Sequence, residues 1–368
     1  MTMVNPSRIL FARERRGLTQ IKLAQELEVD PKTVRNYENG KYIPDGEKLK
    51  KLAEILEFPV EFFFKDDPYQ ITDDAVSFRR LSRASNTLKK RAVNAGKMAF
   101  EFNDWLEANF KLPQSELPDL SDLDPEMAAS SLRKMWGLGE MPISNCIHLL
   151  ESKGVRVFSL EIEAKEIDAF SVWKNNTPFV FLNTFKSAEH SRFDACHELA
   201  HLVRDTHSMK LQNGEKSVHS EQEANDFSSA FLLPHESMIT IKSMAKSIPF
   251  LMKEKKKWGV SLAALAYRLN KVGAYSEWEY RNICIFIAQN GFRTKEPDPM
   301  KKEGSLLFKK VFAALDKESI NKTDIANALK FNRDDLEKLT FKLALGVVSN
   351  RTPSTEVVKE RKLNLKVV

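Results

Sequence analysis

Residues 197 to 201 read His-Glu-Leu-Ala-His and carry the side chains that metal-dependent hydrolysis needs. On a helix, His197 and His201 lie four positions apart, about 40° around the axis and one turn along it, so both imidazoles can reach one metal ion. Glu198 then lies beside the metal's open position, where a carboxylate can take a proton from water. This H-E-x-x-H pattern is typical of zinc-dependent proteases. We therefore predict Zn²⁺ bound by His197 and His201, with Glu198 as the catalytic base.

A zinc ion with two histidine ligands needs a third ligand from the protein, and a carboxylate from a later helix is the usual complement. Glu221 and Glu223 are the candidates. Because helix positions two apart are about 200° apart around the axis, only one of them can face the metal. Glu223 shares its face with Phe227 and Phe231, an apolar stripe that should point inward, whereas Glu221 shares its face with Asn225. We predict Glu223 as the third ligand; the other interpretation is a structural acid paired with another group.

The elements before the motif should form a small sheet. Three short runs rich in β-branched and aromatic residues precede it, and Asn175-Asn176 is a turn signal between the last two. We expect a small antiparallel sheet, followed by a helix from about Ser187 to Arg204 that carries the motif. Such an order is zincin-like, and in it an edge strand can hold an extended substrate by main-chain pairing. The expected strands are residues 155–160, 168–173 and 178–183.

The N-terminal residues 6–64 have the pattern of five short helices. Thr19 is placed to cap a helix that runs to about Leu27, and Asp30-Pro31 begins the next helix as N-cap and first residue. Val34 and Tyr37 take the core-facing spacing of that second helix. A helix-turn-helix with a polar, partly basic outer face is what a DNA major groove accepts, although a merely solvated face has the same pattern. The outward residues are Lys32, Thr33, Arg35 and Asn36.

Length and composition favour an ordinary globular protein of two or three domains. The chain has 368 residues, of which 42% are hydrophobic and 29% charged, and its net charge of +6 permits nucleic-acid binding without requiring it. No stretch approaches the ~18 uninterrupted apolar residues of a membrane span, and residues 1–9 lack the apolar core of a signal peptide. We expect a cytoplasmic protein with no membrane partner. Its three cysteines are isolated in sequence, which argues against a disulfide framework and a thiolate zinc site.

The rest of the chain should be mainly helical. Residues 66–125 have the pattern of a linker and a helical connector, with seven basic residues between Arg79 and Lys97. That run could contact DNA phosphates, but a solvated face beside an acidic surface is the favoured interpretation. The remaining predicted boundaries are residues 126–240 for the domain with the metal motif, 241–300 for a helical extension, 301–356 for a C-terminal helical domain and 357–368 for a charged tail.

The segment around the metal motif resembles the ImmA/IrrE family of metallopeptidases. The resemblance rests on SRFDACHELAHLVRD followed by EQEANDFSSAFLLP, and it covers roughly residues 150–240. It implies a gluzincin-like zinc endopeptidase with His197, His201 and Glu223 as ligands and Glu198 as base. Known members cut repressor proteins that silence stress, phage or mobile-element genes. Ala200 stands where the family commonly has glycine, and Cys196 where it has alanine or threonine.

The N-terminal segment LTQIKLAQELEVDPKTVRNYENGKYIPDGEKLKKLAEIL resembles the Xre or phage-repressor helix-turn-helix family, and the resemblance extends over residues 6–64. It implies base or phosphate contacts from Gln20, Lys32, Thr33 and Asn36, with Lys41 near the DNA backbone. Pro31 departs from the polar residue that the family usually has at the start of the recognition helix. Such domains generally act as dimers on paired half-sites, so we expect a homodimer and a double-stranded DNA operator.

The sequence therefore predicts an α+β protein that is mostly α. Residues 1–65 form the helix-turn-helix domain, and a zincin-like domain with a small sheet and a metal-binding helix follows the connector. The predicted function is a DNA-binding zinc endopeptidase that cleaves a transcriptional repressor or other regulatory protein, encoded nearby. The alternative is a helix-turn-helix regulator or antitoxin in which the peptidase-like domain is a structural or sensory module.

Overall fold

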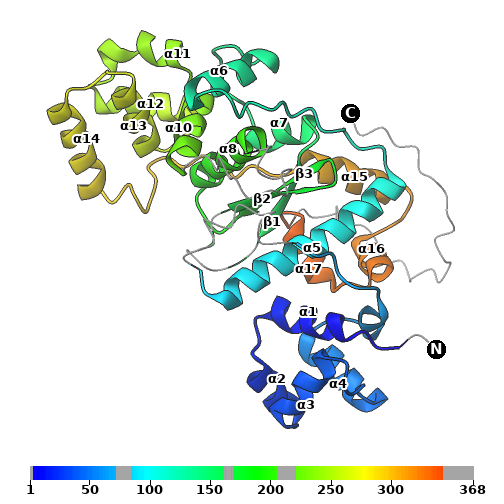
Figure 1. Cartoon of the computed structure of the whole chain (residues 1–368). Helices are drawn as coiled ribbons and strands as arrows, with labels where there is room; N and C mark the ends of the chain where they lie inside the picture. The colour runs from blue at the N-terminus through cyan, green and yellow to red at the C-terminus, as the bar shows by residue number, and fades with distance from the viewer. Residues whose placement is uncertain are drawn as a thin grey trace.

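The computed structural model describes residues 3–71, 84–160, 162, 167, 169–205 and 221–342. It is mostly helical around one small sheet, as the sequence predicted, with the N-terminal helices at one end of the molecule and the helices between residues 235 and 289 at the other (Figure 1). Of the helices in these described ranges, none is long and apolar enough to span a lipid bilayer.

The N-terminal domain contains four α-helices and a final 3-10 helix. They are α1 (Pro6–Arg16), α2 (Gln20–Leu27), α3 (Pro31–Glu38), α4 (Gly46–Leu56) and η1 (Val60–Phe64). The predicted caps are confirmed, because the Thr19 side chain accepts from the backbone N–H of Lys22 and the Asp30 side chain from that of Lys32. Val34 and Tyr37 are buried, also as predicted.

Helix α5 (Asn86–Asn109) connects the N-terminal domain to the rest and runs along the sheet (Figure 1). Ser85 caps its N-terminus by accepting from the backbone N–H of Leu88. Of the basic run, Arg79, Arg80 and Arg83 lie outside the described residues. Lys90 pairs with Glu14 of α1 at 2.6 Å, which fits the interpretation of a basic face beside an acidic surface. Two helices, α6 (Pro125–Met135) and α7 (Cys146–Ser152), then lead to the sheet.

The sheet has the strand order β1-β3-β2 and is mixed, not antiparallel as predicted. Strands β2 (Ala169–Lys174) and β3 (Thr177–Asn183) form the expected hairpin, with Asn175 in the left-handed region at φ 54°. Strand β1 (Arg156–Leu160) instead runs parallel to β3. Every residue of β1 is buried, which is usual for a parallel strand that is covered on both faces.

The sheet separates two hydrophobic cores. Phe158, Phe170 and Phe181 point into one core, which extends through α5 and the C-terminal helices to the N-terminal domain. Val157 and Val180 point into the other, beneath the helices on the opposite face. The C-terminal helices are α15 (Leu306–Lys317), α16 (Lys322–Leu329) and α17 (Arg333–Leu339).

The second core contains the metal-motif helix. Its helices are α8 (Ala188–Arg204), α10 (Glu221–Leu232), α11 (His235–Thr240), α12 (Ile248–Trp258), α13 (Leu262–Lys271) and α14 (Glu277–Gln289), with the 3-10 turn η4 (Lys242–Met244). Helix α8 packs on β2 and β3 on one side and on α7 and α10 on others. The side chains on α8 are therefore held from several directions.

Buried ion pairs join the N-terminal domain to the rest. Arg15 and Arg16 of α1 both bind Asp335 of α17, with N–O distances of 2.8 and 2.7 Å. Arg8 binds Glu101 of α5 at 2.7 Å. The DNA-binding fold is thus packed against the connector and the C-terminal helices through α1, while α2, α3 and α4 lie on the far side of α1 (Figure 1).

Candidate metal centre

Helix α8 places the two histidines of the motif together inside the protein. Ser187 caps the helix by accepting from the backbone N–H of His190, close to the start that the sequence predicted. His197 is 0% exposed and His201 is 4% exposed. Their Nε2 atoms lie 3.1 Å apart. Two nitrogens bound to a tetrahedral zinc at about 2.0–2.1 Å would be separated by roughly 3.3 Å, so the spacing suits a shared ion.

Glu221, the first residue of α10, completes the cluster. Its carboxylate oxygens lie 3.2 Å from His197 Nε2 and 3.9 Å from His201 Nε2. One ligand atom from each of the three residues falls within 4.8 Å of the others. Two neutral imidazoles and a carboxylate are a donor set that zinc commonly takes at hydrolytic sites.

The structure thus brings Glu221, and not the predicted Glu223, to the histidines. The apolar stripe of α10 that includes Glu223 packs near α6 and not against the histidines. Its Phe231 lies edge-on against Trp136 at the end of α6, with 5.9 Å between the ring centroids. The polar face of α10 meets α8 instead, because Asn225 accepts a hydrogen bond from His197. Glu223 instead lies near Arg204, and its charge acts to raise the pKa of that guanidinium against the lowering effect of burial. The apolar stripe does point inward as predicted, with Phe227 and Phe231 buried, but the histidines lie on the polar side of α10.

Two further side chains orient the histidines, and neither was predicted. His197 Nδ1 donates to Asn225 Oδ1 at 3.0 Å, and His201 Nδ1 donates to Asp205 Oδ2 at 2.7 Å. These bonds place the protons on Nδ1 and leave both Nε2 lone pairs for a metal. Burial lowers the pKa of His201, but the bond to Asp205 and the nearby carboxylates outweigh burial, and the net shift is upward. Asp205 stands four residues after His201, a helical spacing that could have indicated it.

The two carboxylate oxygens of Glu198 differ in their hydrogen bonding. Ser171 Oγ of β2 donates to Glu198 Oε2 at 2.8 Å, and both residues are 0% exposed. Within the described part of the chain, Glu198 Oε1 has no hydrogen-bond partner. An unpaired buried carboxylate oxygen is costly unless another group uses it. A water beside a metal at His197 and His201 would satisfy it, so this oxygen supports the fit of the site to zinc.

The nucleic-acid side of the molecule has the expected exposed face. Lys32, Arg35 and Lys41 are exposed, and Thr33 and Asn36 are partly exposed, all on or just after α3. Gln20 differs, because its amide donates to the buried Glu38 at 2.6 Å. Glu38 is also held by Arg13. Gln20 is therefore tied to the domain's own core network in this structure.

Comparisons with known proteins agree with the two sites. Residues 150–270 match the family model of the IrrE N-terminal-like domain, and residues 9–63 match a helix-turn-helix model. Two curated relatives resemble the chain, both uncharacterized HTH-type transcriptional regulators, from Sinorhizobium medicae and Rhizobium meliloti. Each is 36% identical over 62 residues, which are 17% of this chain. The chain spans less than half the length of these relatives, 45% in each case. It is a helix-turn-helix domain joined to an IrrE N-terminal-like peptidase-family domain.

Proposed function

We propose that the protein is a zinc-dependent endopeptidase carried on a DNA-binding domain, and that it cleaves a transcriptional repressor or a similar regulatory protein. The observation that carries the proposal is the convergence of His197, His201 and Glu221 beside a buried Glu198, one of whose oxygens has no partner among the described residues. A structural metal site would gain nothing from an unpaired general base beside the ligands.

In this proposal the ligands are His197, His201 and Glu221. Zinc held there would lower the pKa of a water and polarise a peptide carbonyl. Glu198 Oε1 takes the proton from the attacking water and passes it to the leaving amine. Ser171 keeps Glu198 Oε2 in place, so that Oε1 alone faces the reaction. Asn225 and Asp205 hold the imidazole rings in the ligating orientation.

Strand β2 is placed to bind the substrate. It is an edge strand, paired only with β3 in the described sheet, and its Ser171 contacts Glu198 directly. A peptide added along this edge by main-chain hydrogen bonds would pass next to the general base. Such pairing needs an unfolded or looped stretch of substrate, which suits a linker between the domains of a repressor.

The DNA-binding part of the proposal assigns Lys32, Thr33, Arg35 and Asn36 to the major groove and Lys41 to phosphates, with Gln20 released from Glu38 on binding. The protein would bind a double-stranded operator as a homodimer. Replacing Lys32 and Asn36 together by alanine should remove sequence-specific binding in a titration against genomic DNA fragments. Unchanged sequence preference in the double variant would contradict this assignment.

The test of the peptidase uses Glu198→Gln, which keeps the shape of the side chain and removes the base. Wild type and variant are purified with zinc, their zinc contents are measured, and each is incubated with repressor proteins encoded by the neighbouring genes. The proposal expects equal zinc contents with cleavage by the wild type alone. Equal behaviour of the two proteins towards the repressor would refute it.

A second function has one observation in its favour. The pairs of Asp335 with Arg15 and Arg16 join the DNA-binding domain to α17, which contacts β1 of the sheet whose other face α8 covers. A regulator that senses metal and changes its DNA affinity would need such a link. That regulator would bind its operator with a zinc-dependent affinity and leave the repressor uncut, so the same proteins distinguish the two functions.

A further inference from the structure

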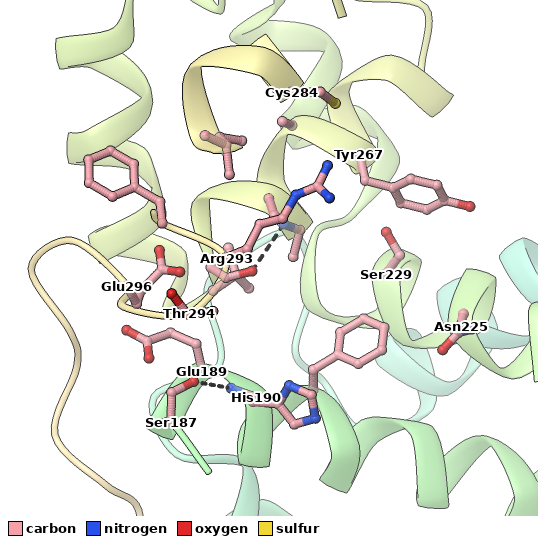
Figure 2. A pocket seen from close by; sticks show the side chains of 18 of the residues that line it. Ser187, Glu189, His190, Asn225, Ser229, Tyr267, Cys284, Arg293, Thr294 and Glu296 are labelled. Carbon is pink, nitrogen blue, oxygen red and sulfur yellow. Dashed lines mark hydrogen bonds between the residues drawn. The ribbon is translucent and has the colours of Figure 1, made fainter. Parts of the chain in front are cut away.

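A cavity of about 570 Å³ lies beside the metal centre, between α8, α10, α13 and α14. Its size falls within the range of about 300–1,000 Å³ that is usual for ligand sites. Figure 2 shows side chains from all of these helices and from the 292–296 loop converging on it. None of the steps proposed above uses this cavity.

The cavity shares its walls with the metal centre. Asn225 lines it and accepts from His197 Nδ1. Phe193 also lines it and lies one helical turn before His197 on α8, and Gln222 lines it directly after Glu221 on α10. A peptide whose backbone lies at the metal centre could therefore place a neighbouring side chain in the cavity.

The walls are aromatic and aliphatic. Phe193, Tyr267, Tyr280 and Phe292 surround the space, with Ala264 and Ile287 among the smaller apolar residues. Part of this wall, from Tyr280 to Glu296, lies beyond residue 270, where the match to the IrrE N-terminal-like domain ends.

The cavity is lined by one guanidinium, that of Arg293, and by the carboxylates of Glu189 and Glu296. Glu189 and Glu296 share the buried amine of Lys255, at 3.8 and 3.2 Å, and within the described residues Glu189 Oε2 has no hydrogen-bond partner. They also accept from backbone N–H groups of Met300 and Leu262. Arg293 extends into the cavity (Figure 2), and within the part of the chain that the structure describes it enters no ion pair. A carboxylate in the cavity would meet an uncommitted guanidinium.

We infer that this cavity is the specificity pocket for the protein substrate, and that it takes a large apolar side chain next to an acidic residue, close to the scissile bond. This inference rests on the proposed peptidase function. The apolar side chain packs among the aromatic residues, and the acid pairs with Arg293. Asn225 links the pocket to the metal centre, because its side chain lines the cavity and accepts from His197 Nδ1.

The test is cleavage of a peptide library by zinc-loaded wild type, Ala264→Phe and Arg293→Ala. Ala264→Phe fills the pocket, and Ala288→Phe is its control on the exposed face of α14. Arg293→Ala has Lys295→Ala as its control, an exposed cation of the same loop that does not line the cavity. Zinc content and thermal unfolding are measured for each variant to establish that the fold is intact.

We expect the wild type to prefer a large apolar residue with an acidic neighbour at one fixed distance from the cut. Ala264→Phe should lower kcat/KM for those peptides by roughly 10- to 100-fold and shift the preference to small residues. Arg293→Ala should remove the preference for the acid and keep the apolar one. Preferences identical to those of the wild type in both variants would overturn the inference while leaving the peptidase intact.

Failure of the proposed function has a different signature. If the wild type cuts no peptide, the peptidase proposal fails, and the pocket is then judged by retention of library peptides on the immobilised protein. Retention of apolar-acidic peptides by wild type and not by Ala264→Phe would support the pocket as a peptide site. Equal retention by both would refute it.

Discussion

At the scale of single residues, the chemistry depends on which atoms are paired and which are left free. Both Nδ1 atoms of the histidine pair are engaged, by Asn225 and Asp205, while their Nε2 atoms face each other. Glu198 follows the same principle, with Oε2 bound by Ser171 and Oε1 unpaired among the residues that the structure describes. The histidines and Glu198 could be predicted because their spacing fixes their relation on one helix. The third carboxylate could not, because it depends on how two helices pack.

Glu221 and Glu223 provide a direct test of that packing. Glu221→Gln should weaken zinc binding by at least about 10-fold, because it removes the charged third ligand, whereas Glu223→Gln should leave it nearly unchanged. A competition titration against a chelator measures both affinities. Loss of zinc in Glu223→Gln with normal binding by Glu221→Gln would restore the ligand set predicted from sequence.

At the scale of elements, helix caps and the tight turn could be predicted from residues that are close together in the sequence. The caps at Thr19 and Asp30 and the β2–β3 hairpin follow from the residues at those positions, since side-chain caps and tight turns need only neighbours in sequence. The direction of β1 could not be predicted in this way. It depends on a connection that carries the chain to the opposite edge of the sheet, and a short buried run is compatible with either direction.

Helix α15 depends on a buried acid whose pKa is shifted. Glu151 of α7 accepts from the backbone N–H groups of Leu306 and Leu307 and from the Ser305 hydroxyl at the start of α15. Burial raises the pKa of Glu151 to about 7, against a usual 4.5, although these bonds lower it in part. Because the folded pKa lies above the unfolded one, the contribution is fully present below pH 4.5 and is lost as the pH rises through about 7.

We expect the stability of the wild type and that of Glu151→Gln to depend differently on pH. Between pH 5 and 8 the free energy of unfolding of the wild type should fall relative to that of Glu151→Gln, by up to about 3 kcal/mol. Urea denaturation followed by circular dichroism at several pH values measures it. Parallel profiles for the two proteins would show that Glu151 does not titrate in this range.

At the scale of the whole molecule, the N-terminal and C-terminal segments are parts of one packed body. The first core runs from the DNA-binding helices through α5 to α15, α16 and α17. This packing of the two ends of the chain against each other was not predicted from the sequence. Contacts between residues some 320 positions apart, such as Arg15 with Asp335, leave no periodic trace in either segment. Residues 343–368, with the predicted tail, lie outside the described part of the chain.

Asp335 should be the most sensitive point of this junction. Burial would raise its pKa, but Arg15 and Arg16 outweigh burial and lower it. Asp335→Ala leaves the buried guanidinium of Arg15 without its carboxylate, while the partly buried Arg16 keeps Glu57 at 3.3 Å, so we expect a loss of about 3–5 kcal/mol of stability. Asp334→Ala, at the exposed neighbouring position, is the control. Denaturation that is equal in both variants would mean that the pairs are not needed to hold the domain.

The central claim is that a zinc ion at His197, His201 and Glu221 makes this protein a peptidase. The most direct measurement is the rate of repressor cleavage as metal-stripped protein is titrated with Zn²⁺. The account predicts no cleavage without metal and a rate that rises to a plateau at about one zinc per chain. It also predicts no recovery in His197→Ala at the same zinc concentrations. Cleavage that persists at full rate in the metal-stripped protein would contradict it.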